Sequence, residues 1–253
     1  MKKHLLFVQL LAVTLSAISC KKNTDHNSNT NIPEKNVVKG KVTDTQGRPL
    51  KGVSILIDNT IIYNSYISGT TGDDGTYKVE LITGAWQAYA SMKVPYNGKT
   101  YTIDLHPDNN SGFGGDGAVR NFSWKLTGAK AEPMTGVYGG IILVDKHGIG
   151  DIYDTENIEF TLTPVGNLID GTAGQVIKRS LGASGSDLEH KLYDLPMGRY
   201  TVSAVYHGAA GSQPIKLRDR INNTNGAFAS SLQLNFEPST SEGYNMAMIE
   251  WEG

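Results

Sequence analysis

Cys20 is the residue whose type and position say most about chemistry, because it is the only cysteine among 253 residues. With no second cysteine present, no disulfide can form within the chain. A lone thiol in an exported protein would be free to oxidise, so its presence needs an explanation. Attachment of a lipid to the sulfur supplies one, and the residues in front of Cys20 indicate whether that chemistry is expected.

The segment before Cys20 has the pattern of a secretory leader. Two lysines form a short positive region, residues 5–18 are almost entirely apolar, and Ser19 is small. The apolar run is too short to remain in a bilayer as a spanning helix, which predicts a cleaved signal peptide over residues 1–19. The alternative is a plain signal peptide with a chance cysteine nearby.

A cysteine at the cleavage point resembles the lipobox of bacterial lipoproteins, although Ala17 stands where leucine is usual. The resemblance implies that the Cys20 sulfur receives a diacylglycerol and that the freed amine receives a further acyl chain, such as palmitate. Two or three acyl chains anchor a protein far more firmly than one. It also implies a location in the cell envelope, with the outer membrane favoured and the choice between periplasmic and surface face left open.

Residues 20–36 contain almost no apolar side chains. Such a segment cannot bury enough surface to fold, so we expect a flexible tether between the lipid and the first domain. The remaining chain is long enough for two domains. The full chain has a formal net charge of −2 and its basic residues are not clustered, which argues against a nucleic-acid partner.

Short segments of alternating polar and apolar residues, separated by many of the 29 glycines, dominate the rest of the chain. No stretch with helical periodicity occurs outside the leader. This pattern predicts an all-β chain with two consecutive β-sandwiches, transthyretin-like or immunoglobulin-like, over residues 37–129 and 130–253. The strands are expected at 38–42, 53–57, 77–81, 86–90, 99–105 and 122–126, and then at 137–144, 158–162, 188–195, 199–206, 215–217, 231–236 and 245–251.

The stretch GKVTDTQGRPLKGVSILIDN followed by TTGDDGTYKVELITGAW resembles the carboxypeptidase regulatory-like domain over residues 37–92. The spacing of its glycines, of Pro49 and of Tyr77 carries the likeness. The resemblance implies a small transthyretin-like sandwich that serves as a structural or interaction module without catalysis of its own. Because this domain recurs beside outer-membrane uptake receptors, it also implies an envelope-protein partner.

One segment repeats along the chain, as LITGAWQAYAS at 81–91 and LPMGRYTVSAV at 195–205. Gly84 matches Gly198, and Trp86 matches Tyr200. The pattern predicts a hairpin in which each glycine provides a backbone angle that a side chain would strain. Duplication of one domain and convergence on a common β pattern both explain the repeat.

The other residues that could do chemistry do not form a recognised pattern. His190 and His207 could meet across strands, but nothing in their spacing requires it. Residues 108–112 lack the third side-chain ligand and the terminal glutamate of a calcium loop, so a turn is expected. Ser184 lies in a Gly/Ser loop rather than a nucleophile elbow. We therefore predict no enzyme activity, no catalytic residue, no cofactor and no metal.

The aromatic residues raise the question of glycan binding. Tyr89, Tyr96 and Tyr101 surround a polar stretch and are the candidate platform for a sugar. The leading hypothesis is a non-enzymatic, lipid-anchored accessory binding or scaffolding module, with a glycan-binding lipoprotein second and a hydrolase a remote third. The tryptophans alternate with apolar partners and are expected in the core: Trp86, Trp124 and Trp251.

Overall fold

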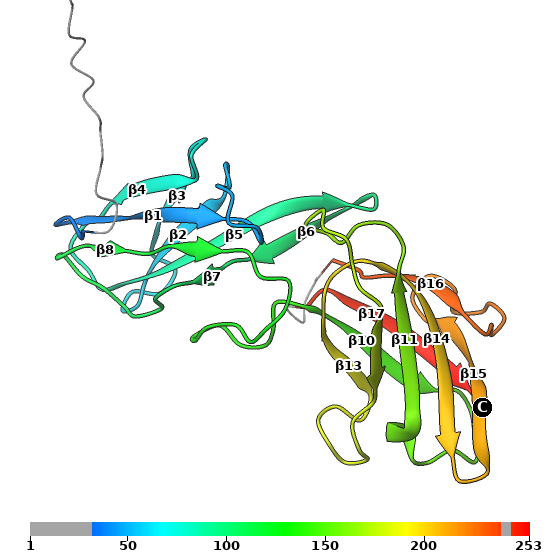
Figure 1. The fold of residues 1–253 in the computed structure, drawn as a ribbon. Coiled ribbons are helices and arrows are strands. Elements are labelled where there is room, and N and C mark those ends of the chain that lie inside the picture. The colour runs from blue at the N-terminus through cyan, green and yellow to red at the C-terminus, as the bar shows by residue number, and fades with distance from the viewer. Residues whose placement is uncertain (1–31, 239–243) are drawn as a thin grey trace, which may run out of the picture.

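The computed structural model describes residues 32–238 and 244–253, so Cys20 and the leader lie outside the described residues. Figure 1 shows two β-sandwiches arranged end to end, with β1 to β9 in the first and β10 to β17 in the second. The helical content of the described chain is a 3₁₀ turn, Thr155–Asn157, which confirms the all-β prediction. Among these residues no helix has the length and apolarity needed to cross a membrane.

The first sandwich packs two sheets face to face. Alternation places one side of each strand between the sheets, where Val42, Ile57 and Phe122 are buried. One sheet has the order β4 (Thr76–Glu80), β1 (Val37–Thr43), β9 (Phe122–Ser123), β7 (His106–Pro107), and β8 (Ala118–Val119) also pairs with β1. The other has the order β3 (Tyr66–Thr70), β2 (Ser54–Asn59), β5 (Trp86–Tyr96), β6 (Lys99–Asp104).

The second sandwich is one continuous sheet that folds over on itself. Its hinge is β15 (Gly211–Asp219), which pairs with β14 through its first half and with β17 through its second. The remaining strands are β10 (Gly140–Lys146), β11 (Ile158–Pro164), β12 (Ile177–Ser180), β13 (Lys191–Leu195), β14 (Arg199–Gly208), β16 (Leu232–Asn235) and β17 (Met246–Glu252).

Most of the strand pairings recur in the two sandwiches, although β15 pairs with β17 and β6 does not pair with β9. β1 pairs antiparallel with β4 and parallel with β9, just as β10 pairs antiparallel with β13 and parallel with β17. β2 lies between β3 and β5, as β11 lies between β12 and β14, and β5–β6 corresponds to β14–β15. Even the register agrees, because Ala90 faces Ile55 and Ala204 faces Phe160. The short sequence repeat is thus part of a larger correspondence of strand pairings, which favours duplication over chance.

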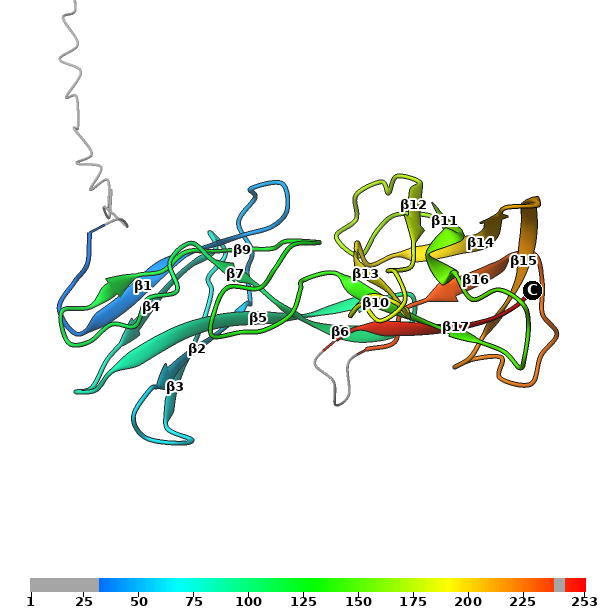
Figure 2. The same cartoon turned by 90° about the horizontal axis from the view of Figure 1, so that it is seen from below.

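The repeated segment is not a hairpin, which corrects the expectation from sequence. β4 and β5 belong to opposite sheets, and β13 and β14 likewise lie in opposite layers, so each segment crosses its sandwich (Figure 2). In both copies the aromatic ring bonds back to the carbonyl four residues earlier. Trp86 Nε1 donates to the Ile82 oxygen at 3.2 Å, and the Tyr200 hydroxyl donates to the Pro196 oxygen at 2.6 Å.

Gly84 and Gly198 also have a different role from the predicted one. Neither has a positive φ, so neither supplies a special backbone angle. A Cβ on Gly84 would lie 2.9 Å from ring atoms of Trp86, and one on Gly198 would lie 2.8 Å from Leu168 Cδ2. These glycines are therefore required by close packing against the neighbouring side chains.

Candidate functional site

The β5–β6 hairpin reaches out of the first sandwich and contacts the second (Figure 1). Asn97 and Gly98 form its two-residue turn, with φ of 48° and 78°, as an Asn-Gly hairpin favours. The Tyr96 hydroxyl donates to the Asn167 oxygen at 2.8 Å and accepts from the Arg199 amide at 3.0 Å. The hairpin tip is thus held by backbone groups of the β11–β12 loop and of the first residue of β14.

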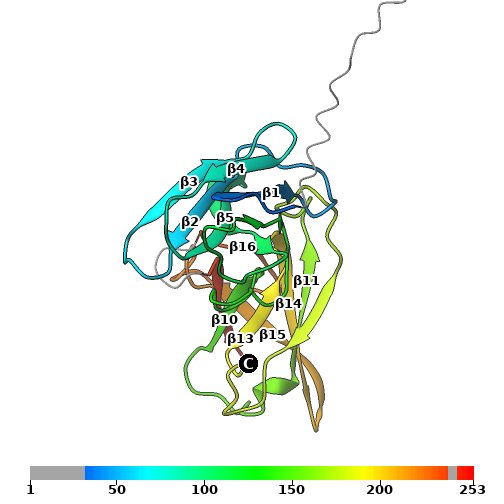
Figure 3. The same cartoon turned by 90° about the vertical axis from the view of Figure 1, so that its left-hand side faces the viewer.

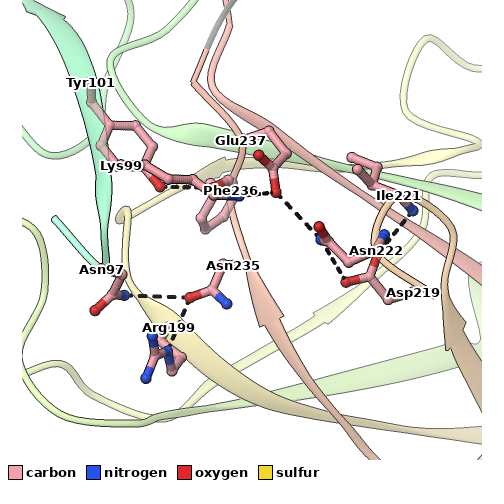
Figure 4. Close-up of polar contacts among 10 residues, drawn as sticks. All are labelled: Asn97, Lys99, Tyr101, Arg199, Asp219, Ile221, Asn222, Asn235, Phe236 and Glu237. Carbon is pink, nitrogen blue, oxygen red and sulfur yellow. Dashed lines mark hydrogen bonds and ion pairs between the residues drawn. The ribbon is translucent and has the colours of Figure 1, made fainter.

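Tyr101 is the centre of this junction (Figure 4). Its side chain is only 1% exposed, and its hydroxyl donates to the Phe236 oxygen at 2.8 Å. Burial, with a smaller contribution from the Glu237 carboxylate, raises the pKa of Tyr101 to about 12. Beside it, Lys99 forms an ion pair with Glu237, which also accepts from Asn222.

The linker between the sandwiches is clamped as well. The Asp194 carboxylate accepts from the Gly128 amide at 2.8 Å and from the Gly139 amide at 3.1 Å, so it ties together both ends of the linker. Lys130 Nζ lies 2.7 Å from Asp104 Oδ2 in the first sandwich. Hairpin and linker together hold the two sandwiches in one arrangement.

This junction overturns the predicted glycan platform. Tyr101 is buried and Tyr96 has its hydroxyl engaged by the second sandwich, so neither is available to a sugar. Their polar sequence neighbours suggested exposure, but the residues that cover them lie far along the chain. Of the three tyrosines, Tyr89 alone lies on a free face of the sheet.

Tyr89 instead forms part of a hollow of about 850 Å³ on the outer face of β2 and β3. Tyr66 lies opposite Asp58, and Tyr89 lies opposite Leu56, in neighbouring strand pairs. Burial and the nearby Asp58 carboxylate raise the pKa of Tyr89. The hollow is lined by Leu56, Asp58, Asn59, Thr60, Ile61, Tyr63, Asn64, Tyr66 and Tyr89.

This hollow has only a weak signal in the sequence. Tyr63 and Tyr66 fall between the strands expected at 53–57 and 77–81, in a stretch with no clear alternation. The sequence signal for an apolar surface here is the presence of two adjacent isoleucines and two tyrosines within residues 61–66. Tyr63 and Tyr66 are 99% and 58% exposed, so both rings are accessible to solvent.

A charged cluster at the far end of the second sandwich was also missed by sequence reasoning. Glu250 accepts from Arg218 and lies 2.9 Å from His147 Nδ1, and these partners lower its pKa. The Arg218 guanidinium carbon lies 4.3 Å from the centre of the Phe228 ring. The cluster ties β15 to β17 and to the segment after β10.

The remaining candidates do not converge on a reactive site. His207 pairs with Ser212 at 2.8 Å and His190 lies 3.9 Å from Glu189, so each histidine has its own neighbour. Asp108 accepts from the Asn121 amide and side chain, and Ser184 donates to Glu189. In the described part of the chain, no three His, Cys, Asp or Glu residues group as metal ligands. The core positions predicted for Trp86, Trp124 and Trp251 are confirmed, with 1%, 8% and 1% exposure.

Comparison with known protein families finds no match. Among curated proteins, structural protein 27 of a virus (isolate Australia/Victoria) is 28% identical over 89 residues, which is 32% of this chain. The chain spans only 16% of that protein's length.

Several solved structures show low similarity to this chain. The TIE protein of Bacillus anthracis is 14% identical with a TM-score of 0.30, over 86% of this chain and 34% of that one. A putative adhesin from Bacteroides ovatus is 8% identical with a TM-score of 0.27, over 82% and 87%. Pilins and adhesins recur among the matches. Fervidolysin from Fervidobacterium pennivorans, a keratinolytic enzyme related to subtilisin, is 12% identical with a TM-score of 0.26, over 73% of this chain and 28% of that one. Sequence identities and TM-scores this low do not indicate a shared activity.

Proposed function

We propose that this chain is a non-enzymatic, lipid-anchored envelope protein that acts as an accessory binding or scaffolding module. The observation that carries the proposal is the end-to-end arrangement of two sandwiches joined by a clamped junction. The described chain begins at the outer end of the first sandwich, and the second sandwich lies at the opposite end. An anchor at the start of the chain would hold the second sandwich away from the membrane.

Acylation of Cys20 is the part of this proposal that fixes the location. Residues 20–32 can span at most about 45 Å when fully extended, so the first sandwich would stay close to the bilayer. The outer membrane, an uptake-receptor partner and the likeness of residues 37–92 to the carboxypeptidase regulatory-like domain belong to the same proposal. Recurrence of pilins and adhesins among the structural matches is compatible with a surface role but does not select it.

Replacing Cys20 with serine tests the anchor. We expect the Cys20→Ser variant to accumulate uncleaved and without acyl label, because the serine oxygen cannot replace the sulfur that receives the lipid. Ser19→Ala is the matched control, since it keeps a small residue before the cysteine and should be processed and remain in the membrane fraction. Fractionation, metabolic acyl labelling and mass spectrometry read the result. Normal cleavage of Cys20→Ser with unchanged membrane partition would contradict the anchor.

The hollow beside Tyr66 and Tyr89 favours a second candidate function, glycan binding. Tyrosine rings pack against the C–H faces of sugars, and the Asp58 carboxylate beside them can accept hydrogen bonds from hydroxyls. We expect Tyr66→Ala with Tyr89→Ala to weaken retardation by soluble mannan or β-glucan in affinity electrophoresis by about fivefold or more. Tyr153→Ala, at a 75% exposed tyrosine of the second sandwich, is the control. Equal retardation of wild type and the double variant would exclude the hollow as the glycan site.

A further inference from the structure

We propose that the outer end of the first sandwich inserts apolar loop residues into the lipid surface to which the chain is tethered. The loop tip consists of Ile61, Ile62 and Tyr63 in the β2–β3 loop and Ile82 in the β4–β5 loop. Its orientation toward the bilayer rests on the proposed lipid anchor. The partner is a lipid surface, recognised through apolar side chains and an interfacial tyrosine.

The exposure of the loop tip is the first observation. Ile61, Ile62, Tyr63 and Ile82 are 78%, 60%, 99% and 69% exposed. Single exposed apolar residues are common on proteins and need no function, but a group in adjacent loops marks an interaction surface. Tyrosine is enriched where membrane meets water, because its ring is apolar and its hydroxyl is polar.

Hydrogen bonds hold the two loops together in a fixed shape. The Thr60 amide donates to the Ala85 oxygen at 2.9 Å, which links the β2–β3 loop to the β4–β5 loop. Asn59 Oδ1 accepts from the amides of Ile61 and Ile62, both at 2.9 Å. A loop that is already ordered loses little conformational entropy when its side chains enter the bilayer.

The loop tip lies at the same end of the sandwich as the tether. β1 begins beside the end of β4, with Val37 opposite Glu80, and the Leu81 amide donates to the Asn36 oxygen at 2.8 Å. Figure 3 looks onto this end of the molecule, and the pairing of Asn59 with Trp86 places the end of β2 beside the start of β5 there. An anchor attached through the tether would therefore bring this end toward the lipid.

The corresponding end of the second sandwich is covered by protein, because the β5–β6 hairpin of the first sandwich packs against it. There Asn167 and Arg199 contact the β5–β6 hairpin, and Met197 is buried. In a second copy of the chain, the β14–β15 hairpin is the counterpart of the β5–β6 hairpin. That hairpin ends at Gly208 and turns at Ala209 and Ala210, none of which carries a hydroxyl like that of Tyr96, so the polar contacts of the junction have no counterpart. A lipid surface fits this end better than a second copy.

Two lysines near the start of the described chain are paired with an acid. Lys78 Nζ lies 2.8 Å from Glu34 and Lys39 Nζ lies 3.8 Å from it, so these cations already face an acid. Insertion of the apolar loop tip should not require anionic lipid, unlike binding through a basic patch alone.

A fluorescent label at the loop tip tests the inference. The protein is the chain from residue 20 onward with Cys20→Ser, which contains every described residue, carrying an N-terminal histidine tag. It is attached to phosphatidylcholine vesicles that contain a nickel-chelating lipid. A single environment-sensitive dye is placed on Ile82→Cys, and Ile149→Cys is the matched control, because Ile149 is fully exposed on the second sandwich.

We expect emission from position 82 to shift to the blue and to be quenched by doxyl-labelled phosphatidylcholine at least about twofold more than emission from position 149, as insertion by several ångströms requires. Adding Ile61→Ser and Ile62→Ser should reduce that quenching toward the control. Equal quenching at both positions would overturn the inference. A blue shift that grows with protein density without doxyl quenching would also overturn it, in favour of a second copy. Because the tag replaces the lipid, these outcomes are independent of whether Cys20 is acylated.

Discussion

Replacing Tyr101 with alanine will lower the free energy of unfolding by about 3–5 kcal/mol, the usual cost of removing a fully buried aromatic side chain. Tyr101 is 1% exposed and bridges the two sandwiches through its bond to the Phe236 oxygen. Tyr101→Phe keeps the ring and removes that bond, which should cost about 1–2 kcal/mol because the carbonyl loses its donor. Chemical denaturation followed by tryptophan fluorescence measures both changes.

Tyr77 provides a matched control for the junction. It is also buried, and its hydroxyl donates to the Arg120 oxygen at 2.7 Å, within the first sandwich. Tyr101→Phe should therefore speed amide hydrogen exchange in residues 232–237 of the second sandwich, whereas Tyr77→Phe should not. Unchanged exchange there in Tyr101→Phe would mean that the junction does not couple the two sandwiches.

The regular strands and the core could be predicted from sequence because alternation records burial on one face. Tyr77, Val79 and Leu81 alternate with polar residues and are all buried in the structure. The short strands β3 and β12 were missed for the same reason, since most of their residues are exposed and no alternation marks them. Their existence follows from pairing with β2 and β11, which a single segment does not reveal.

The candidate surfaces were harder to predict, because the exposure of a side chain depends on residues that lie far away in the sequence and pack over it in the fold. Tyr101 and Tyr89 have similar sequence surroundings, but only Tyr101 is covered by Phe236 and Glu237, which lie about one domain further along the chain. Conversely, Ile61 and Ile82 are apolar, but the structure leaves them exposed. Cys20 lies outside the described residues, so its acylation stays a prediction.

Gly84→Val and Gly198→Val will each lower the free energy of unfolding by about 3 kcal/mol, as overpacking of a tight core site does. A Cβ on Gly84 would lie 2.9 Å from Trp86 Cε2, and one on Gly198 would lie 3.2 Å from Tyr200 Cε2. Both rings are 1% exposed and bonded to backbone carbonyls, so they cannot move aside cheaply. Thermal or urea unfolding of each variant gives the loss.

Asparagine separates crowding from backbone strain at these glycines. Asparagine tolerates a positive φ better than other side chains, so it should be nearly neutral at Gly47, where φ is 79° and no atom lies within 4 Å of the added Cβ. At Gly84 and Gly198 the added atoms meet a ring, so Gly84→Asn and Gly198→Asn should cost nearly as much as the valine variants. If asparagine were tolerated at Gly84 as well as at Gly47, packing against Trp86 would not be the reason for the glycine. The common geometry argued for the two sandwiches would then lose its physical basis at this position.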